Sequence, residues 1–308
     1  MKAGLNTKPK TKRIGVIDTG SNTVRLAVFD CDLSDRSKFK EPIDVKAVAG
    51  LSNYVQDGIF TQRGVEKASR TLSRHIDRAE NLNCDEIYVF ATAVLRNASN
   101  SEQAVHAIEK RIGHKIDLLS GFDEARLGCQ GAFADGDDKE GTLIDLGGGS
   151  CEVTCFGETS VFSQSLKLGC ISTYSEFVNC LFPTEEECRA IRFAAQDAIR
   201  SLNCDLSKTK QLFGIGGSVR AIARLTREMK CLEKTPKHIW ATDVQDAVEL
   251  LESHPDLFAH AAVRAVPERL HSVVPGCLII GELISACGVE ELDIKKGGLR
   301  EGYLLSKL

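Results

Sequence analysis

The sequence predicts an α/β protein built from two domains. Its 308 residues exceed the roughly 100–200 residues of a single domain. Short runs of β-forming residues alternate along the chain with longer stretches of helical periodicity, which is typical of the α/β class. A strand–turn–strand pattern whose first strand ends at Asp18 recurs around Asp145, so the second half is expected to repeat the design of the first.

The first half is predicted to alternate strands and helices around two apolar faces. The turn 19–22 joins two β-rich runs, and the helical stretch that follows places Val65, Leu72 and Ile76 on one face. In order, the expected elements are strands over 14–18 and 23–30, a helix over 61–82, a strand over 86–91, a helix capped by Ser99 or Asn100 and ending near Ile112, a strand over 116–119 and a helix over about 123–134.

The second half is predicted to begin after a polar, glycine-bounded segment at 135–141, the best candidate for a domain junction. The strand–turn–strand pattern then starts again. The expected elements are strands over 142–145, 151–156, 161–166 and 212–215, and helices near 172–181, 184–202, 218–229, 242–251, 275–287 and 300–308.

Composition excludes several classes of protein. Hydrophobic residues make up 43% and charged residues 27%, which excludes wholesale disorder. No uncharged apolar run reaches the roughly 18–20 residues that span a bilayer. The N-terminal segment has no apolar stretch typical of a secretory signal. We therefore expect a cytoplasmic protein without a membrane partner.

Charge and cysteine content narrow the choice further. The net charge is −4, although the first 13 residues hold five basic residues and no acid, so the remaining body is distinctly acidic. Such a body argues against binding nucleic acid by phosphate neutralisation. The 12 cysteines include no Cys-x-x-Cys pair. We therefore expect free, buried thiols in a reducing cytosol rather than a zinc or redox site.

The two strand–turn–strand segments share a chemical logic. When residues 14–29 are aligned with 141–156, identities fall at Ile17/Ile144, Asp18/Asp145, Gly20/Gly147 and Phe29/Phe156. A turn of small residues exposes backbone N–H groups and lets a phosphate approach closely, and the aspartate becomes useful when a divalent cation lies between it and the phosphate. Either loop alone could be a simple β-hairpin. The pair favours a phosphate chain held from both sides of a cleft.

A third glycine loop lies at 214–218, between a predicted strand and a predicted helix. Backbone amides at a helix start bind anions well, but a tight strand-to-helix turn explains this loop equally well. The segment completes neither the GxGxxG pattern of dinucleotide-binding folds nor the GxxxxGK[ST] pattern of P-loop proteins.

Together these loops resemble those of the actin-like ATPase superfamily, and within it those of the exopolyphosphatase/guanosine pentaphosphate phosphohydrolase (Ppx/GppA) family. The resemblance is carried, in family order, by segments 18–26, 91–100, 120–126, 145–152, 165–169, 214–218 and 297–302. It implies two actin-like (ribonuclease H-like) α/β domains with an active site in the cleft between them. The implied domains are 1–135 together with a C-terminal helix at about 300–308, and 136–299.

The resemblance implies an activity and a set of site residues. The reaction is hydrolysis of the terminal phosphoanhydride of inorganic polyphosphate, or of the 5′-triphosphate end of pppGpp, with Mg²⁺ or another divalent cation. Glu124 is implied as the base for water, with Asp145 and Glu152 as further catalytic groups, and Asp145, Glu152 and Asp18 as metal ligands. The implied substrate-binding residues are Gly20, Ser21, Asn22, Thr23, Arg25, Arg96, Gly147, Gly148, Gly149, Ser150, Gly216, Gly217, Ser218 and Arg269.

Two features of the candidate site follow from position. Glu124 lies at a predicted helix start, where the helix dipole favours the ionised carboxylate that a base needs. Arg25 and Glu152 occupy equivalent places in the aligned loops, so one loop carries a base where the other carries an acid. The first suits a phosphate, and the second suits a metal or a water molecule.

Three residues depart from the family pattern. Asp123 replaces the first of two usual glutamates, Cys151 replaces a threonine and faces inward in the predicted strand, and His271 stands where an acid is usual. The last weakens the role assigned to Arg269. None of the three removes a proposed catalytic group.

Other functions stay open at this point. A pppGpp phosphohydrolase uses the same terminal-phosphate chemistry as an exopolyphosphatase. A small-molecule kinase of the same superfamily would bind adenosine at a loop such as 214–218, but it needs an acceptor pocket that the sequence does not reveal. A non-catalytic sensor of phosphate chains would be indicated by loss of Glu124 or Asp145, and both are present. A homodimer is also possible.

Overall fold

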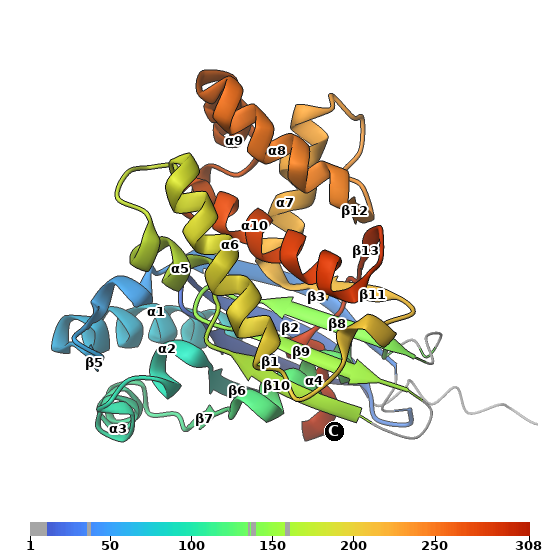
Figure 1. Ribbon diagram of the computed structural model, residues 1–308. Helices are drawn as coiled ribbons and strands as arrows, with labels where there is room; N and C mark the ends of the chain where they lie inside the picture. Colours follow the sequence, from blue (N-terminus) through green and yellow to red (C-terminus); the bar gives the residue numbers. More distant parts are fainter. Residues whose placement is uncertain (1–10, 36–37, 135, 137–139, 158–160) are drawn as a thin grey trace, which may run out of the picture.

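Two mixed β-sheets form the framework of the protein (Figure 1). The computed structural model describes residues 11–35, 38–134, 136, 140–157 and 161–308, so most of the predicted junction 135–141 and the basic residues before position 11 lie outside the described residues. The first sheet contains, in spatial order, β3 (Phe39–Val48), β2 (Thr23–Asp32), β1 (Thr11–Thr19), β6 (Glu86–Ala91) and β7 (Ile116–Leu118). The second contains β10 (Val161–Leu166), β9 (Cys151–Phe156), β8 (Gly141–Leu146), β11 (Leu212–Ile215), β13 (Glu291–Ile294) and β12 (His238–Trp240).

The two sheets repeat one topology. In the first, β1, β2 and β3 are successive antiparallel neighbours and β6 lies parallel to β1. In the second, β8, β9 and β10 are antiparallel neighbours and β11 lies parallel to β8. The register also repeats, because Asp18 pairs with Arg25 and Asp145 pairs with Glu152. The sequence repeat is therefore a structural repeat, and the fold class predicted from it is confirmed.

Helices cover the outer faces of both sheets and fill the space between them. The helices are α1 (Gln62–Asn81), α2 (Ala93–Arg96), α3 (Ser101–Ile112), α4 (Gly121–Ala132), α5 (Cys170–Phe177), α6 (Glu185–Arg200), α7 (Gly216–Met229), α8 (Ala241–Ser253), α9 (Pro255–Ala265), α10 (Leu270–Cys287) and α11 (Leu299–Lys307). Short 3₁₀ turns occur at Leu51–Tyr54, Leu206–Lys208 and Pro267–Arg269, and a small hairpin pairs β4 (Val55–Gln56) with β5 (Ile59–Phe60).

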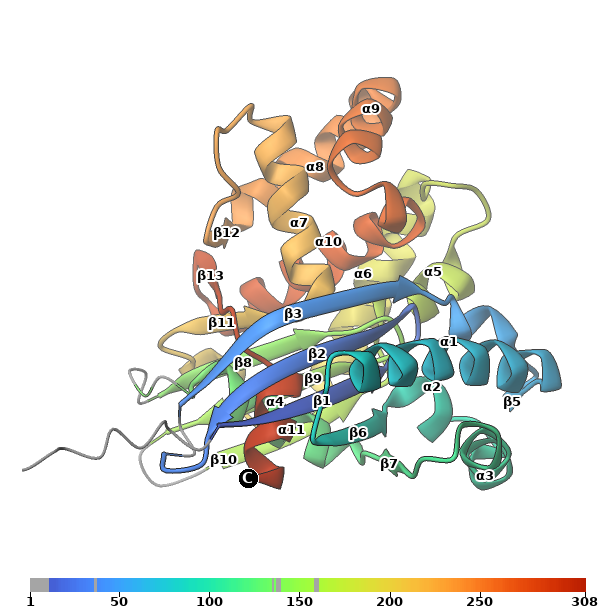
Figure 2. The ribbon, with the colours of Figure 1, turned by 180° about the vertical axis from the view of Figure 1, so that it is seen from behind.

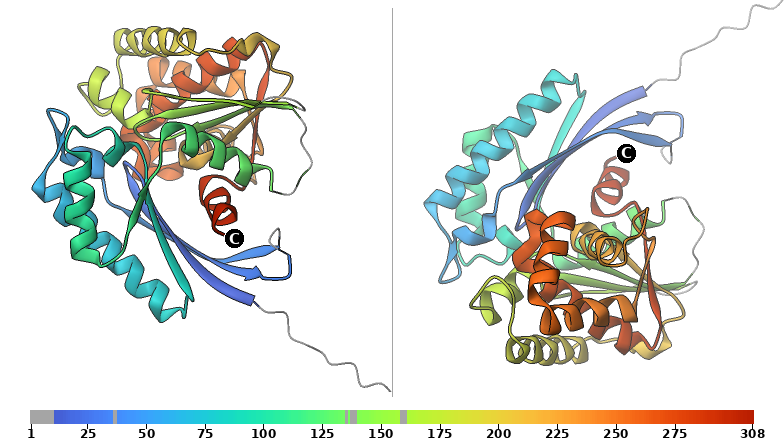
Figure 3. Two further views of the ribbon diagram at one scale, coloured as in Figure 1. Left: turned by 90° about the horizontal axis from the view of Figure 1, so that it is seen from below. Right: turned by 90° about the horizontal axis from the view of Figure 1, so that it is seen from above.

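Apolar packing divides the molecule into layers. On the outer face of the first sheet, α1 and α3 bury residues such as Leu72 and Ile108 against the strands (Figure 2). On the outer face of the second sheet, α6, α7 and α10 do the same around Ile191 and Leu278. Complete burial of one such side chain contributes roughly 1.5–3 kcal/mol. Helices α4 and α11 lie between the two sheets, with Leu127 and Tyr303 packed on the inner face of the first (Figure 3).

The middle layer depends on glycines. A Cβ on Gly131 would lie 1.9 Å from the carbonyl oxygen of Gly298, and a Cβ on Gly302 would lie 1.8 Å from that of Leu127. Only glycine permits this approach of α4 to α11. The C-terminal helix is thus held against the helix that carries Glu124.

Most predicted elements are present, and the exceptions have physical reasons. Strand β3 was not predicted, because it contains Pro42 and alternating charges; it is an edge strand, where such residues are tolerated. Helix α10 begins at Leu270 and includes Pro275, so proline does not start it as expected. Strands β12 and β13 and helices α2 and α9 were also not predicted.

Helix caps are a second point of comparison. Thr184 caps α6, accepting from the amide of Glu187. The side chain of Asn100 does not cap α3 and instead forms two hydrogen bonds with the backbone of Phe60.

Two further expectations concern apolar and cysteine content. In the described residues, one helical stretch, Pro267–Cys287, is long and apolar enough to cross a membrane, and 67% of its most apolar window is buried. That burial is typical of a core helix.

All twelve cysteines are free thiols, but only half of them are buried, and Cys180 and Cys231 are exposed. The expectation of buried thiols therefore holds for half of the set.

Candidate active site

A cavity of about 340 Å³ opens where the two halves of the fold meet. Its lining comes from the turns after β1 and β8, the start of α7, and the segment that leads into α11. Each of the three glycine loops identified in the sequence therefore borders the same space.

The two repeated turns have the same internal hydrogen bond. The amide of Gly20 donates to the carbonyl of Thr23 over 3.0 Å, and the amide of Gly147 donates to that of Ser150 over 2.9 Å. In the part of the chain that the structure describes, the amides of residues 21–22 and 148–149 have no hydrogen-bond partner. Such free amides at a turn are suited to an anion.

The two turns also touch one another across the cavity. A Cβ on Gly149 would lie 2.9 Å from Oγ of Ser21, so a larger residue there would displace the serine hydroxyl of the first turn. Helix α5 holds the second turn from behind, because the amides of Ile171 and Ser172 both donate to the carbonyl of Gly148. These bonds tie down the carbonyl side of the peptide and leave its amide side toward the cavity.

Glu124 reaches the cavity from the first turn of α4 and is buried. Its Oε2 accepts a hydrogen bond from Nη1 of Arg96 over 2.5 Å, and the same nitrogen donates to the carbonyl of Leu119 over 3.1 Å. Glu152 lies behind this pair, fully buried, with Oε1 accepting from Oγ of Ser165 over 2.6 Å and 4.0 Å from Nη2 of Arg96. Arg96 therefore bridges two carboxylates.

The pKa of Glu124 runs against the expectation from its helix position. Burial, and next the charge of Glu152, raise this pKa well above the ordinary value of a glutamate, while Arg96 opposes the rise. Burial also raises the pKa of Glu152 to about 7, with Asp145 adding to the rise. Burial and the facing acid thus outweigh the helix dipole, and Glu124 holds a proton more tightly than a surface glutamate does.

Asp18 and Asp145 are the two predicted metal ligands that line the cavity. Burial raises the pKa of each to about 6, and the charge of Asp145 adds to the rise at Asp18. Both carboxylates line the cavity, and neither accepts a hydrogen bond from any residue that the structure describes. Carboxylate oxygens that accept no hydrogen bond are ligands of the kind that Mg²⁺ prefers. The residues present therefore fit the cation.

The third glycine loop is built against both neighbours. Gly216 has φ +90°, and a Cβ there would lie 2.4 Å from Oδ1 of Asp145. A Cβ on Gly217 would lie 2.4 Å from Nη2 of Arg269, whose Nη1 donates to Oγ of Ser218 over 3.2 Å. The loop therefore brings Asp145 and Arg269 to one wall of the cavity, and Arg269 lies there despite the histidine at position 271.

The structure brings almost all of the predicted site residues together. The cavity is lined by Asp18, Gly20, Ser21, Asn22, Thr23, Arg25, Glu124, Asp145, Gly147, Gly148, Gly149, Ser150, Gly216, Gly217, Ser218 and Arg269. Arg96 and Glu152 are not in this lining. They stand behind Glu124 and reach the cavity only through it.

Several cationic residues of the cavity were not predicted from the sequence: Lys46, Arg220, Arg224, Lys296 and Arg300. Two signals could have indicated three of them. Arg220 and Arg224 are four residues apart on the helix that follows the third glycine loop, so they share one face. Arg300 lies inside the quoted segment 297–302. Lys46 gave no signal, because its strand was not predicted.

The fold and the cavity agree with a phosphatase of the actin-like fold class. Residues 46–308 match the model of the Ppx/GppA phosphatase family, and the chain belongs to that family. The resemblance seen in the sequence is therefore confirmed.

Relatives and solved structures agree with this assignment. Exopolyphosphatase 1 of Mycobacterium tuberculosis is 28% identical over 307 residues, which cover 96% of this chain and 88% of the relative. Exopolyphosphatase 1 of Mycobacterium leprae is 28% identical over 311 residues, which cover 96% of this chain and 89% of the relative. The Aquifex aeolicus PPX-GPPA enzyme has the same fold, with a TM-score of 0.76 and 21% identity over 96% of this chain and 99% of that one. An exopolyphosphatase from Cytophaga hutchinsonii has a TM-score of 0.79 and is 19% identical, and the match covers 96% of this chain and 99% of that one.

Proposed function

We propose that this chain is an exopolyphosphatase that hydrolyses the terminal phosphoanhydride of inorganic polyphosphate with a water molecule activated by Glu124. The observation that carries the proposal is the position of Glu124, a buried carboxylate that lines the cavity shared by the two glycine turns and is held by Arg96. The exopolyphosphatase names of the curated relatives favour polyphosphate as the substrate.

The residues divide the work of phosphoryl transfer. The free amides of the two turns and the hydroxyls of Ser21 and Ser150 hold the terminal phosphate, and the cavity cations hold the phosphates that follow. Glu124 accepts the proton of the attacking water as its oxygen approaches phosphorus in line with the leaving oxygen. The elevated pKa of Glu124 makes it a stronger base than a surface glutamate. The hydrogen bond from Arg96 keeps the carboxylate of Glu124 directed at the cavity.

Asp18 and Asp145 would hold Mg²⁺, with Glu152 placed behind them. When bound, the cation neutralises phosphate oxygens and offsets the repulsion between carboxylates and substrate. We also propose that the functional units are 1–135 with 300–308, and 136–299, and that the enzyme works in the cytoplasm.

The test compares phosphate release from long-chain polyphosphate, pppGpp and ATP with Mg²⁺ present. Glu124→Gln should lower kcat on polyphosphate by roughly 10²–10⁴-fold, because the base is lost. The matched control is Asp123→Asn, which removes the neighbouring carboxyl on the solvent side of the same helix turn and should retain activity.

Each outcome has a distinct meaning. Activity of Glu124→Gln equal to that of the wild type would show that the assigned base is wrong. Release from pppGpp with none from polyphosphate would make the enzyme a pppGpp phosphohydrolase. Transfer from ATP to a small acceptor, with no free phosphate from polyphosphate, would favour a kinase.

A further inference from the structure

The starting point is a row of side chains that crosses the first sheet. Asp18, Arg25 and Lys46 are direct partners across β1, β2 and β3, so all three project from the same face. Strands lie about 4.8 Å apart, which places the backbone of Lys46 about 10 Å from that of Asp18. The cavity therefore continues outward from the turns over a basic row.

The equivalent row of the second sheet has the opposite character. There, Asp145, Glu152 and Ser165 are the partners across β8, β9 and β10. One sheet thus presents bases where the other presents an acid and a hydroxyl. A polyanion leaving the turns along the first sheet therefore meets Arg25, which is paired with Asp44, and then Lys46.

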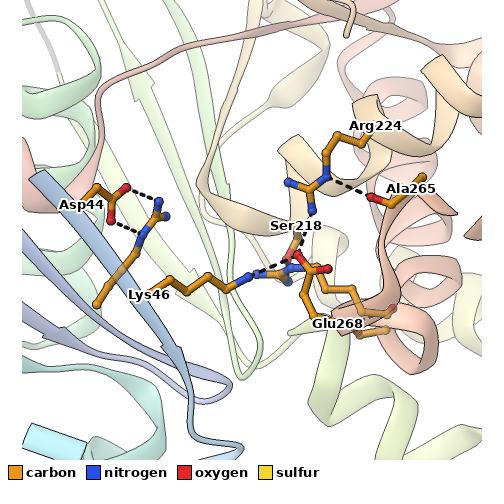
Figure 4. A network of polar contacts seen from close by, with 9 residues as sticks. Asp44, Lys46, Ser218, Arg224, Ala265 and Glu268 are labelled. Carbon is orange, nitrogen blue, oxygen red and sulfur yellow. Dashed lines mark hydrogen bonds and ion pairs between the residues drawn. The ribbon is translucent and has the colours of Figure 1, made fainter. Parts of the chain in front are cut away.

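The outer end of the basic row is occupied by a carboxylate from the other half of the fold. Oε1 of Glu268 lies 3.2 Å from Nζ of Lys46 and 3.0 Å from Nη2 of Arg224 (Figure 4). Lys46 and Arg224 line the cavity, whereas Glu268 is not in its lining and contacts both cations from the rim. One oxygen therefore joins the two halves of the fold and neutralises two cations.

The charge state of Glu268 suits this position. Burial by itself raises the pKa of this carboxyl, but a backbone hydrogen bond and the two cations outweigh it, so the pKa is lowered and the group is ionised at neutral pH. All three side chains are only half-buried, with 28–36% of each exposed. Pairs of this kind are weak enough to exchange partners.

We propose that Glu268 is a specificity-determining residue: it competes with the substrate for Lys46 and Arg224, and only a phosphate chain long enough to reach this pair displaces it. This inference rests on the proposed function, since it assumes that a phosphate chain starts at the turns. A short chain lies over the turns and leaves the Glu268 contacts intact. A long chain exchanges one carboxylate contact for phosphate contacts to both cations.

The experiment measures kcat and KM on tripolyphosphate and on long-chain polyphosphate with Mg²⁺. Glu268→Gln should lower KM for the long chain about three- to tenfold, because the competing charge is removed, and leave KM for tripolyphosphate and both kcat values unchanged. Lys46→Met should raise KM for the long chain alone. The matched control is Glu185→Gln, which removes a carboxylate from the exposed Arg189–Glu185 pair on α6 and corrects for net charge.

Three results would overturn the proposal: an equal change in KM for both chain lengths, a higher KM for the long chain in Glu268→Gln, or no difference from Glu185→Gln. The activity of the wild type distinguishes a failure of the proposed function from a failure of the role proposed for Glu268. If the wild type releases no phosphate from either polyphosphate, the proposed function fails whatever Glu268 does. If Glu268→Gln melts well below the wild type, Lys46→Met still tests whether the long chain reaches the row.

Discussion

At the scale of single residues, the site is governed by carboxylates that are costly to ionise. Glu124 and Glu152 are buried, whereas Asp18 and Asp145 are half-buried on the cavity wall, and burial raises the pKa of all four. Mutual repulsion adds to the effect. The guanidinium of Arg96 lowers this cost at Glu124, the proposed base. A bound divalent cation would lower it at Asp18 and Asp145, the proposed metal ligands.

Arg96 is expected to set the acid side of the pH profile. The base must be deprotonated, so kcat/KM on polyphosphate should rise with pH through the pKa of Glu124. Arg96→Met removes the cation that opposes the rise in this pKa, so the acid limb should move to higher pH. The control is Arg126→Met, on the same helix as Glu124 but paired with Asp123 in solvent. Equal profiles for the two variants would contradict the assignment of the base.

The ionised carboxylate of Asp145 is expected to lower the free energy of unfolding of the protein. Its folded pKa, about 6, lies above the ordinary 3.8, so the folded state binds the proton more tightly and loses stability as the pH rises between these values. Asp145→Asn should therefore raise Tm by about 1–3 °C at pH 8, with a smaller gain at pH 5. Mg²⁺ should stabilise the wild type more than the variant.

Thermal melts at both pH values, with and without Mg²⁺, check this expectation. Asp197→Asn, at an exposed position on α6, provides the control for charge removal. If Asp145→Asn melts below the wild type at pH 8 and at pH 5 alike, Asp145 is a structural residue and the proposed cation position is wrong.

At the scale of elements, the second phosphate turn is positioned by its contact with α5. A Cβ on Gly169 would lie 2.3 Å from the carbonyl oxygen of Gly148. The first amides of α5 hold the carbonyls of Gly147 and Gly148 from the same side. The turn is therefore preorganised by the backbone of a neighbouring helix, and the thiol of Cys170 adds a bond to the carbonyl of Gly147.

Gly169→Ala should displace this turn and lower kcat/KM by at least tenfold, because a shift of a few tenths of an ångström misplaces the amides that hold phosphate. The matched control is Gly157→Ala, whose Cβ would meet, among the described residues, the side chain of Glu140 at 3.9 Å and should be tolerated. Steady-state kinetics and melting curves for the two variants separate a local defect from a general loss of stability. Equal activity in both would show that the turn is not held in this way.

The elements also show what the sequence could predict. The glycine turns and Glu124 were predictable, because short-range patterns and family motifs specify them. The contact of Arg96 with Glu124 was not, since it depends on how α2 and α4 pack. Lys46 was missed because edge strand β3 carries Pro42 and alternating charges, which hide its β character. Pairings between distant segments require the topology.

At the scale of the whole molecule, the local charge of the cavity opposes the net charge. The chain carries a net charge of −4, yet its cavity is lined by seven basic and four acidic residues. The residues outside the lining are therefore net acidic, and a polyanion is attracted most strongly to the cavity. This arrangement favours a narrow phosphate chain over a bulky one.

This contrast predicts a specific response to salt and to nucleic acid. KM for long-chain polyphosphate should rise steadily with ionic strength, because each phosphate contact in the cavity is weakened by screening, whereas kcat should change little. Double-stranded DNA at the same phosphate concentration should not inhibit, since a duplex cannot enter a cavity of about 340 Å³ and meets an acidic surface outside it. Initial rates measured across a salt series, with and without DNA, test both parts. Inhibition by DNA as strong as that by a second polyphosphate chain would place the binding of phosphate on the outer surface instead of the cavity between the two halves.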